Sequence, residues 1–106
     1  MKIAVLGRKE ASANYEKFIL RVCAEPVVSL YPADLTDCEA LILPGGGDIT
    51  PAFFGERNSG SLNIDTELDI LQIQALDLFL EKNKPILGIC KGMQLIYSIT
   101  KIPFKY

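Results

Sequence analysis

Residues 88–92, in the order Gly-Ile-Cys-Lys-Gly, carry the most specific chemical signal in the chain. A short apolar run precedes this segment and a helical pattern follows it, so Cys90 is expected at a turn from a buried strand into a helix. The flanking glycines permit the strained turn of a nucleophile elbow, which projects a side chain above a sheet at a helix N-terminus. The helix dipole, free backbone N–H groups and the charge of Lys91 would each favour a thiolate. We therefore predict that Cys90 is a nucleophile; the alternative is a small core cysteine beside a tight turn.

A second glycine-rich segment, residues 44–48 in the order Pro-Gly-Gly-Gly-Asp, follows another apolar run. Glycines at the carboxyl end of a strand can turn backbone N–H groups toward a ligand, and open α/β sheets bind ligands at this edge. By itself the segment is equally typical of a plain flexible loop. Beside an elbow, one of its amides and the backbone N–H of Lys91 would together form a two-donor oxyanion hole.

The chain has 106 residues and no histidine, which excludes a self-contained Ser-His-Asp triad, a Cys-His dyad and a His-ligated zinc centre. Its 11 basic and 13 acidic residues give a net charge of −2, without the basic cluster that nucleic acids and anionic membranes attract. No apolar run is long enough for a signal-peptide core or a membrane span. We expect a cytoplasmic protein of one domain, residues 1–106, that binds neither nucleic acid nor membrane.

The three cysteines, Cys23, Cys38 and Cys90, show no C-x-x-C spacing, which argues against a disulfide framework or a thiolate metal site. Cys23 falls on the apolar face of a predicted helix and Cys38 lies just before an apolar run, so both are expected to be structural. We expect neither a metal ion nor an organic cofactor.

Polar residues mark the starts of two predicted helices. Ser12 is the candidate N-cap of the first, and Thr66 and Asp69 form a candidate capping box for the second. Asp65, Glu67 and Asp69 could bind a substrate ammonium, although acidic side chains in a first helical turn more often stabilise the helix dipole.

Short apolar runs alternate with these helical patterns, which is typical of β-α-β units and a parallel sheet. Residues 49–61 between two of the elements are expected to form a long irregular surface loop. We predict strands at residues 2–6, 26–30, 40–43 and 86–89, and helices at residues 12–24, from residue 66 to the break at residues 83–85, and at residues 91–99.

Four stretches of the chain together resemble the class I glutamine amidotransferase superfamily, in particular its γ-glutamyl hydrolase branch, which includes γ-glutamyl-γ-aminobutyrate hydrolase. Family domains of this type are considerably longer, so the sequence resembles their N-terminal half. The implied fold is α/β, a flavodoxin-like parallel sheet with helices on both faces, truncated to about four strands. The stretches are Leu41 to Pro51, Phe54 to Glu56, Asp65 to Asp69 and Pro85 to Leu95.

The resemblance implies that Cys90 attacks a γ-glutamyl amide while the backbone N–H groups of Gly46 or Gly47 and of Lys91 hold the oxyanion. It also implies that Gln94 lines a pocket for glutamine or another small γ-glutamyl compound. Relatives use a His-x-Glu pair further along the chain to activate the cysteine and to protonate the leaving amine. This sequence contains no histidine, so we expect a catalytically incomplete site.

Two alternatives stay open. In a four-stranded flavodoxin-like order the strand around Leu87 is an unpaired edge and the apolar helix after Thr66 is only partly covered. Such a chain would serve as a non-catalytic binding module that forms a homodimer or captures a complementing C-terminal fragment. The other alternative is a thiol-reactive protein of the related cysteine-elbow superfamily, whose members usually carry a histidine where this chain has Lys91.

Overall fold

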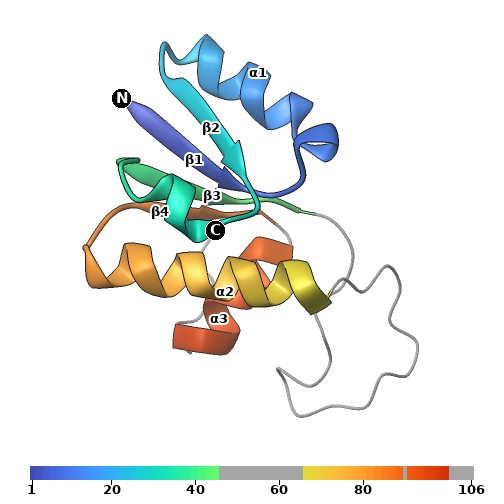
Figure 1. The fold of residues 1–106 in the computed structure, drawn as a ribbon, viewed down its shortest axis with the longest axis vertical. Helices are drawn as coiled ribbons and strands as arrows, with labels where there is room; N and C mark the ends of the chain where they lie inside the picture. The colour runs from blue at the N-terminus through green and yellow to red at the C-terminus, as the bar shows by residue number, and fades with distance from the viewer. Residues whose placement is uncertain (46–65, 90, 101–106) are drawn as a thin grey trace.

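The computed structural model describes residues 1–45, 66–89 and 91–100, and it arranges four parallel strands in one sheet. The strand order is β2-β1-β3-β4 (Figure 1), which confirms the expected flavodoxin-like order. β1 pairs with β2 and β3, whereas β4 pairs with β3 alone among the described elements. The strands are β1 (Lys2–Leu6), β2 (Glu25–Ser29), β3 (Ala40–Leu43) and β4 (Ile86–Gly88).

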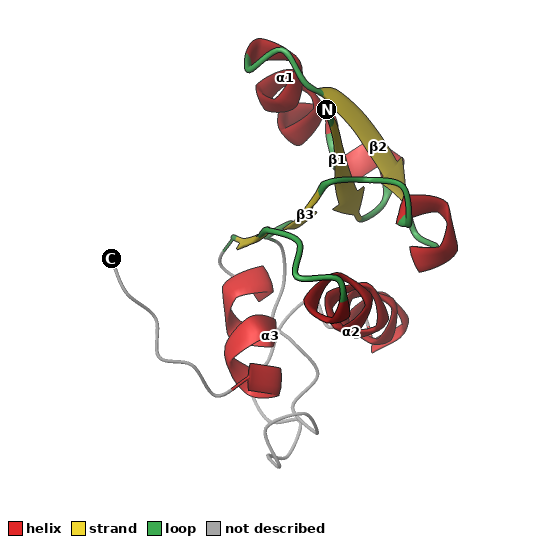
Figure 2. Ribbon diagram, turned by 90° about the vertical axis from the view of Figure 1, so that its left-hand side faces the viewer, coloured by secondary structure: helices red, strands yellow, loops and turns green. Residues whose placement is uncertain are grey.

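Helices cover both faces of the sheet, as the sequence predicts. α1 (Ala13–Arg21) lies on one face, and α2 (Thr66–Glu81) and α3 (Lys91–Thr100) lie on the other (Figure 2). Two short 3-10 helices, η1 (Lys9–Ala11) and η2 (Pro32–Leu35), follow β1 and β2. Ser12 occupies the N-cap position of α1, but its hydroxyl donates to the Arg8 carbonyl oxygen at 2.7 Å instead of capping the helix.

Side chains alternate between the two faces along each strand and so contribute to two apolar layers. The larger layer lies between the sheet and α2, where burial of aliphatic and aromatic side chains supplies the main driving force for packing. The smaller layer, under α1, has Val5, Ile19 and Ile42 as its buried members. The larger layer contains Ala4, Leu6, Leu35, Cys38, Leu41, Leu43, Ala75, Leu76 and Phe79.

The face of the sheet beside α1 carries an open apolar groove with a volume of about 190 Å³. Phe18 of α1 lines this groove together with residues of β1, β3 and β4, and Leu87 in β4 is 51% exposed there. Because β4 has no further strand beside it among the described elements, the expectation of an edge strand around Leu87 is confirmed. The lining residues are Ile3, Phe18, Ala40, Leu41, Ile42, Pro85, Ile86 and Leu87.

The two cysteines in the described ranges differ in environment. Cys38 is buried, as expected, and burial raises the pKa of its thiol. Cys23 is exposed, so the expectation that it lies on an apolar helix face is wrong. The physical reason is that α1 ends at Arg21 and the chain then turns, with Cys23 in the left-handed conformation at φ 61°.

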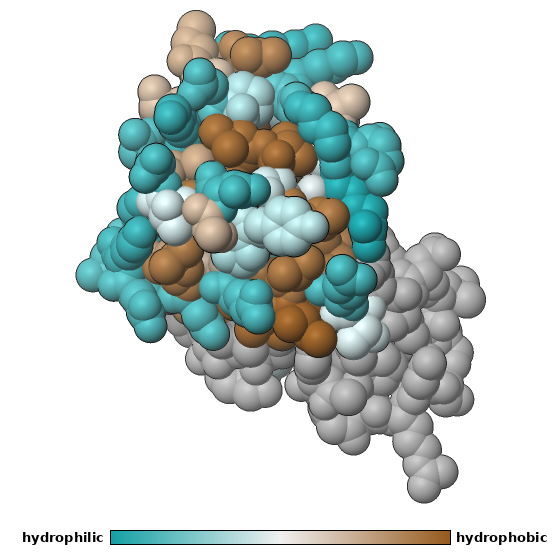
Figure 3. Space-filling view, viewed as in Figure 1, coloured by the Kyte–Doolittle hydropathy of each residue, from teal (hydrophilic) through white to brown (hydrophobic). Residues whose placement is uncertain are grey.

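None of the described helices is both long enough and apolar enough to cross a membrane. The face shown in Figure 3 alternates patches of apolar side chains with hydrophilic ones. Such interspersed apolar atoms are ordinary for a protein surface.

Candidate functional site

The parallel pairing of β3 with β4 brings the two glycine-rich segments to one edge of the sheet. Leu43, the last residue of β3, is the register partner of Gly88, the last residue of β4. One residue further on, the Ile89 N–H donates to the Leu43 carbonyl oxygen at 3.0 Å. The expectation that both segments follow neighbouring strands is therefore confirmed as far as Gly45 and Ile89. Gly46, Gly47 and Cys90 lie outside the described residues.

Gly88 and Gly92 occupy positions where no other residue type fits. A Cβ added at Gly88 would lie 2.6 Å from the Met93 nitrogen and 2.7 Å from the Gly92 carbonyl carbon. A Cβ added at Gly92 would overlap the Leu43 carbonyl oxygen and lie 2.7 Å from the Leu43 Cβ. Real Cβ contacts are not this short, so the glycines allow the first turn of α3 to pack directly on the ends of β3 and β4.

Tyr15 in α1 contacts Gly45, the first glycine of the segment that follows β3. Its hydroxyl oxygen accepts a hydrogen bond from the Gly45 N–H at 3.0 Å. The sequence pattern placed Tyr15 among the apolar positions of its helix and did not indicate this bond. The available signal was the residue type, since a half-buried tyrosine usually finds a polar partner for its hydroxyl.

The side chain of Lys91, the first residue of α3, is buried and forms an ion pair with the Asp69 carboxylate. Asp69 lies in the first turn of α2 and is fully buried. The sequence suggested that Lys91 acts as a free positive charge and that Asp69 caps a helix or binds a substrate ammonium. The structure keeps Asp69 in the first turn of α2 and pairs it with an ammonium of the protein itself.

The helix dipoles explain why Lys91 needs the Asp69 carboxylate as its partner. A carboxylate is favoured at the N-terminus of α2, but an ammonium is disfavoured at the N-terminus of α3, since both ends carry partial positive charge. Asp69 therefore compensates Lys91 and also interacts favourably with its own helix. A buried charge without such a partner would be very costly.

Gln72, one turn after Asp69 in α2, is also a buried polar residue. Its Nε2 atom donates to the carbonyl oxygen of Leu6, the last residue of β1, at 3.0 Å. Its Oε1 atom is buried and accepts no hydrogen bond from the described residues. Gln72 was not among the residues predicted from the sequence. Its helical spacing with Asp69, Leu76 and Phe79 would have indicated that it lies on the buried face of α2.

The predicted substrate-binding residue, Gln94, is exposed and lies one turn along α3 from Lys91. Neither of the two described cysteines serves this edge: the Cys38 thiol is buried with a raised pKa, and Cys23 lies in the turn between α1 and β2. The described ranges contain no group of three or more Cys, Asp or Glu side chains that could hold a metal ion.

The Gly92→Ala variant should lose about 3 kcal/mol of unfolding free energy, because the added methyl group clashes with backbone atoms that cannot move independently. Urea denaturation measures this loss. Gly7→Ala is the matched control, since its nearest neighbour would be the Pro44 Cγ atom at 3.1 Å, and it should cost less than about 1 kcal/mol. Equal losses in the two variants would contradict the close approach of α3 to β3.

Asp69→Asn should destabilise the fold by about 3–5 kcal/mol, because it leaves the buried Lys91 ammonium without an anionic partner. The control is Glu16→Gln, which breaks the Lys9–Glu16 ion pair at 2.7 Å, with side chains 71% and 24% exposed. Its cost should stay below about 1 kcal/mol, since water screens exposed pairs. Denaturation curves of both variants at low and high salt test the difference, and similar costs would refute it.

Residues 3–100 match the Peptidase C26 family model. Among curated proteins, the chain is 38% identical over 63 residues to the glutamine amidotransferase-like protein YvdE of Lactococcus lactis, covering 58% of this chain and 27% of that protein. It is 36% identical over 90 residues to the glutamine amidotransferase-like protein RP404 of Rickettsia prowazekii, covering 78% and 32%. It is 34% identical over 85 residues to subunit HisH 2 of imidazole glycerol phosphate synthase of Parasynechococcus marenigrum, covering 80% and 35%.

The matched region spans between 27% and 35% of the length of these three relatives. The family match covers β1 to α3, the same elements that bring the two glycine-rich segments together. The chain thus belongs to the Peptidase C26 family, and its fold is that of a class I glutamine amidotransferase-like domain.

Proposed function

We propose that this chain supplies the nucleophile and oxyanion half of a site that cleaves γ-glutamyl amides, with Cys90 as the nucleophile. The observation that carries the proposal is the direct packing of Gly92 on the end of β3, which aligns the start of α3 with the glycine segment after β3. The first N–H groups of a helix have no partner within the helix, so those without another acceptor are available to an anion. In α3 the Gly92 N–H donates to the Ile89 carbonyl oxygen at 2.9 Å, and the Lys91 N–H is our candidate donor.

The chemistry requires a nucleophile, an oxyanion hole, a general base and a general acid. This chain would supply the first two. The Cys90 thiolate attacks the amide carbonyl carbon, and the N–H groups of Lys91 and of Gly46 or Gly47 would stabilise the oxyanion. The C–N bond then breaks, a proton must pass to the leaving amine, and water hydrolyses the glutamyl thioester. The acid and base for the last two steps are the missing half, because the sequence holds no histidine.

The substrate class follows from the family. Relatives named as glutamine amidotransferase-like proteins support glutamine or a small γ-glutamyl compound as the ligand. Gln94, exposed on α3 one turn from Lys91, is our candidate for recognising the glutamyl group. We further propose a cytoplasmic location, which agrees with the lack of a membrane-spanning helix in the described ranges.

The test is covalent labelling with a glutamine analogue that carries a chloromethyl ketone at the γ-carbon, followed by peptide mass spectrometry. The thiolate displaces chloride, so this reagent needs no general acid. We expect modification of Cys90 in preference to Cys23 and Cys38, slowed by free glutamine. Gln94→Ala should reduce this preference by about fivefold, the effect of losing one hydrogen bond.

The matching turnover measurement uses a γ-glutamyl anilide. The rate for the chain should equal that of Cys90→Ala, because loss of a catalytic base costs roughly a million-fold in serine proteases. A chloromethyl ketone on a leucine scaffold is the control for non-specific alkylation. Labelling of Cys23 as fast as Cys90, or no protection by glutamine, would overturn the proposed site; turnover abolished by Cys90→Ala would overturn its incompleteness.

A second candidate function is self-association through β4, which the open edge of the sheet favours. The Leu41 N–H donates to the Pro85 carbonyl oxygen at 3.0 Å, and the Ile89 N–H likewise bonds to β3. Because a strand alternates its bonding direction, the backbone groups of Ile86 and Gly88 point away from β3. A second copy could pair with them and cover Leu87.

Sedimentation at high protein concentration tests this association. We expect a dimer for the natural sequence, and dissociation for Leu87→Lys, because a charge on an edge strand opposes pairing. Leu80→Lys is the matched control, since Leu80 on α2 is 41% exposed and does not line the groove beside β4. A monodisperse monomer at all concentrations would contradict the candidate.

A further inference from the structure

The Asp69–Lys91 ion pair adjoins the candidate nucleophile directly in sequence. Lys91 follows Cys90, yet its side chain is only 4% exposed and that of Asp69 is fully buried. In such an environment water screens charges weakly, so the charge that Lys91 presents to its neighbours depends on its partner. The ammonium and the carboxylate together have no net charge.

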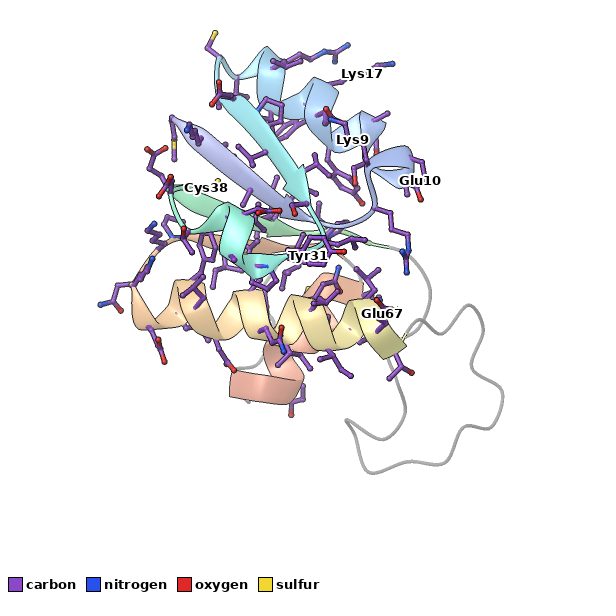
Figure 4. All side chains as sticks on the ribbon, in the orientation of Figure 1. Lys9, Glu10, Lys17, Tyr31, Cys38 and Glu67 are labelled. Atoms are coloured by element: carbon purple, nitrogen blue, oxygen red, sulfur yellow. The ribbon has the colours of Figure 1, made fainter. Side chains whose placement is uncertain are left out.

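On the described elements that pack against α3, the remaining charged side chains are exposed to solvent. Asp69 and Lys91 are the buried charged side chains of the described ranges. α3 packs against α2, β3 and β4, and the two strands contain no titratable side chain. The other acidic residues of α2, Glu67 (Figure 4), Asp77 and Glu81, are exposed.

The lysine nearest to β4 in sequence faces the opposite edge of the sheet. The Lys84 Nζ atom donates to the carbonyl oxygens of Cys38 at 2.6 Å and Thr36 at 3.1 Å, which precede β3. Lys84 therefore lies at the amino edge, away from the start of α3. Among the described residues, the Asp69–Lys91 pair is therefore the buried charge at that helix terminus, and Arg8, half-buried after β1, is a further cation at the carboxyl edge of the sheet.

We propose that Asp69 is a positioning residue that neutralises Lys91, so that the backbone N–H groups of α3 rather than a lysine cation set the reactivity of the thiol at position 90. This inference rests on the proposed role of Cys90 as nucleophile. Its consequence is chemical: a thiolate held by a strong cation has a lower pKa and is a weaker nucleophile. Asp69 also anchors Lys91 toward α2, which holds the Lys91 backbone N–H in place for an oxyanion.

The experiment measures the rate of Cys90 alkylation by iodoacetamide against pH, resolved by peptide mass spectrometry, in the full chain with Cys23→Ser. Asp69→Asn removes the carboxylate that neutralises Lys91. At pH values where Lys91 keeps its proton, its ammonium should lower the pKa of Cys90 by about one unit, a tenfold gain in thiolate well below the pKa. The double variant Asp69→Asn with Lys91→Met removes both charges. Its Cys90 pKa should match that of the parent chain.

Asp69→Glu is the matched control: it keeps the negative charge, and the Cys90 pKa should stay at the parent value. Burial of Cys38, monitored as its resistance to the same reagent, shows whether each variant is folded. If Asp69→Asn alone unfolds, the double variant decides, since replacing a buried ion pair by neutral groups is often tolerated. A double variant with a raised Cys90 pKa, or a folded Asp69→Asn with an unchanged one, would overturn the inference.

Failure of this inference is distinguishable from failure of the proposed function. Iodoacetamide needs no glutamyl recognition, so its pH profile reports the thiol environment alone. The glutamine-protected labelling described above reports substrate recognition and does not depend on the sign of the pKa change. If the glutamine-protected labelling succeeds, Cys90 remains the nucleophile in either case. A raised Cys90 pKa in the double variant would then make Lys91 a cationic activator, and an unchanged pKa in Asp69→Asn would mean that the Lys91 charge does not reach the thiol.

Discussion

The parallel pairing of β3 with β4 is the constraint on which the candidate site depends. Because parallel strands end at the same edge, the segments that follow Leu43 and Gly88 start side by side even though α2 separates them in the chain. Gly92 then allows α3 to approach the Leu43 backbone more closely than a side chain would permit. Without this approach, the first turn of α3 would stand away from the end of β3.

Two polar residues of α2 contact the same edge from the face of the sheet that α2 and α3 cover. Asp69 compensates the charge of Lys91, and Gln72 binds the carbonyl oxygen of Leu6 at the end of β1. A buried ion pair seldom adds stability over apolar packing, so its presence points to a positioning role. Tyr15 acts from the opposite face by accepting the Gly45 N–H. The ends of β1, β3 and β4 are thus held by contacts from helices on both faces.

Most of the fold was predictable from the sequence, because each element has a local signal. Apolar runs bounded by Gly7 or Pro44 indicated two of the strands, and Pro85 marked the break after α2. The prediction for Cys23 failed because helical spacing does not determine where a helix stops; α1 ended before this residue and left it exposed in a turn. The partner of Lys91 could not be predicted, since Asp69 lies in another helix and the pairing arises only when α2 and α3 pack on the same face.

The sequence by itself determined the α/β class, the order of elements and the two glycine-rich segments, because short-range steric and hydrophobic preferences encode them. It also determined that these 106 residues contain no histidine. Only the tertiary structure decided that Gly92 rests on Leu43 and that Lys91 is neutralised rather than free. The physical reason is that burial and charge pairing depend on which surfaces of distant elements meet, and no local pattern in the chain specifies that.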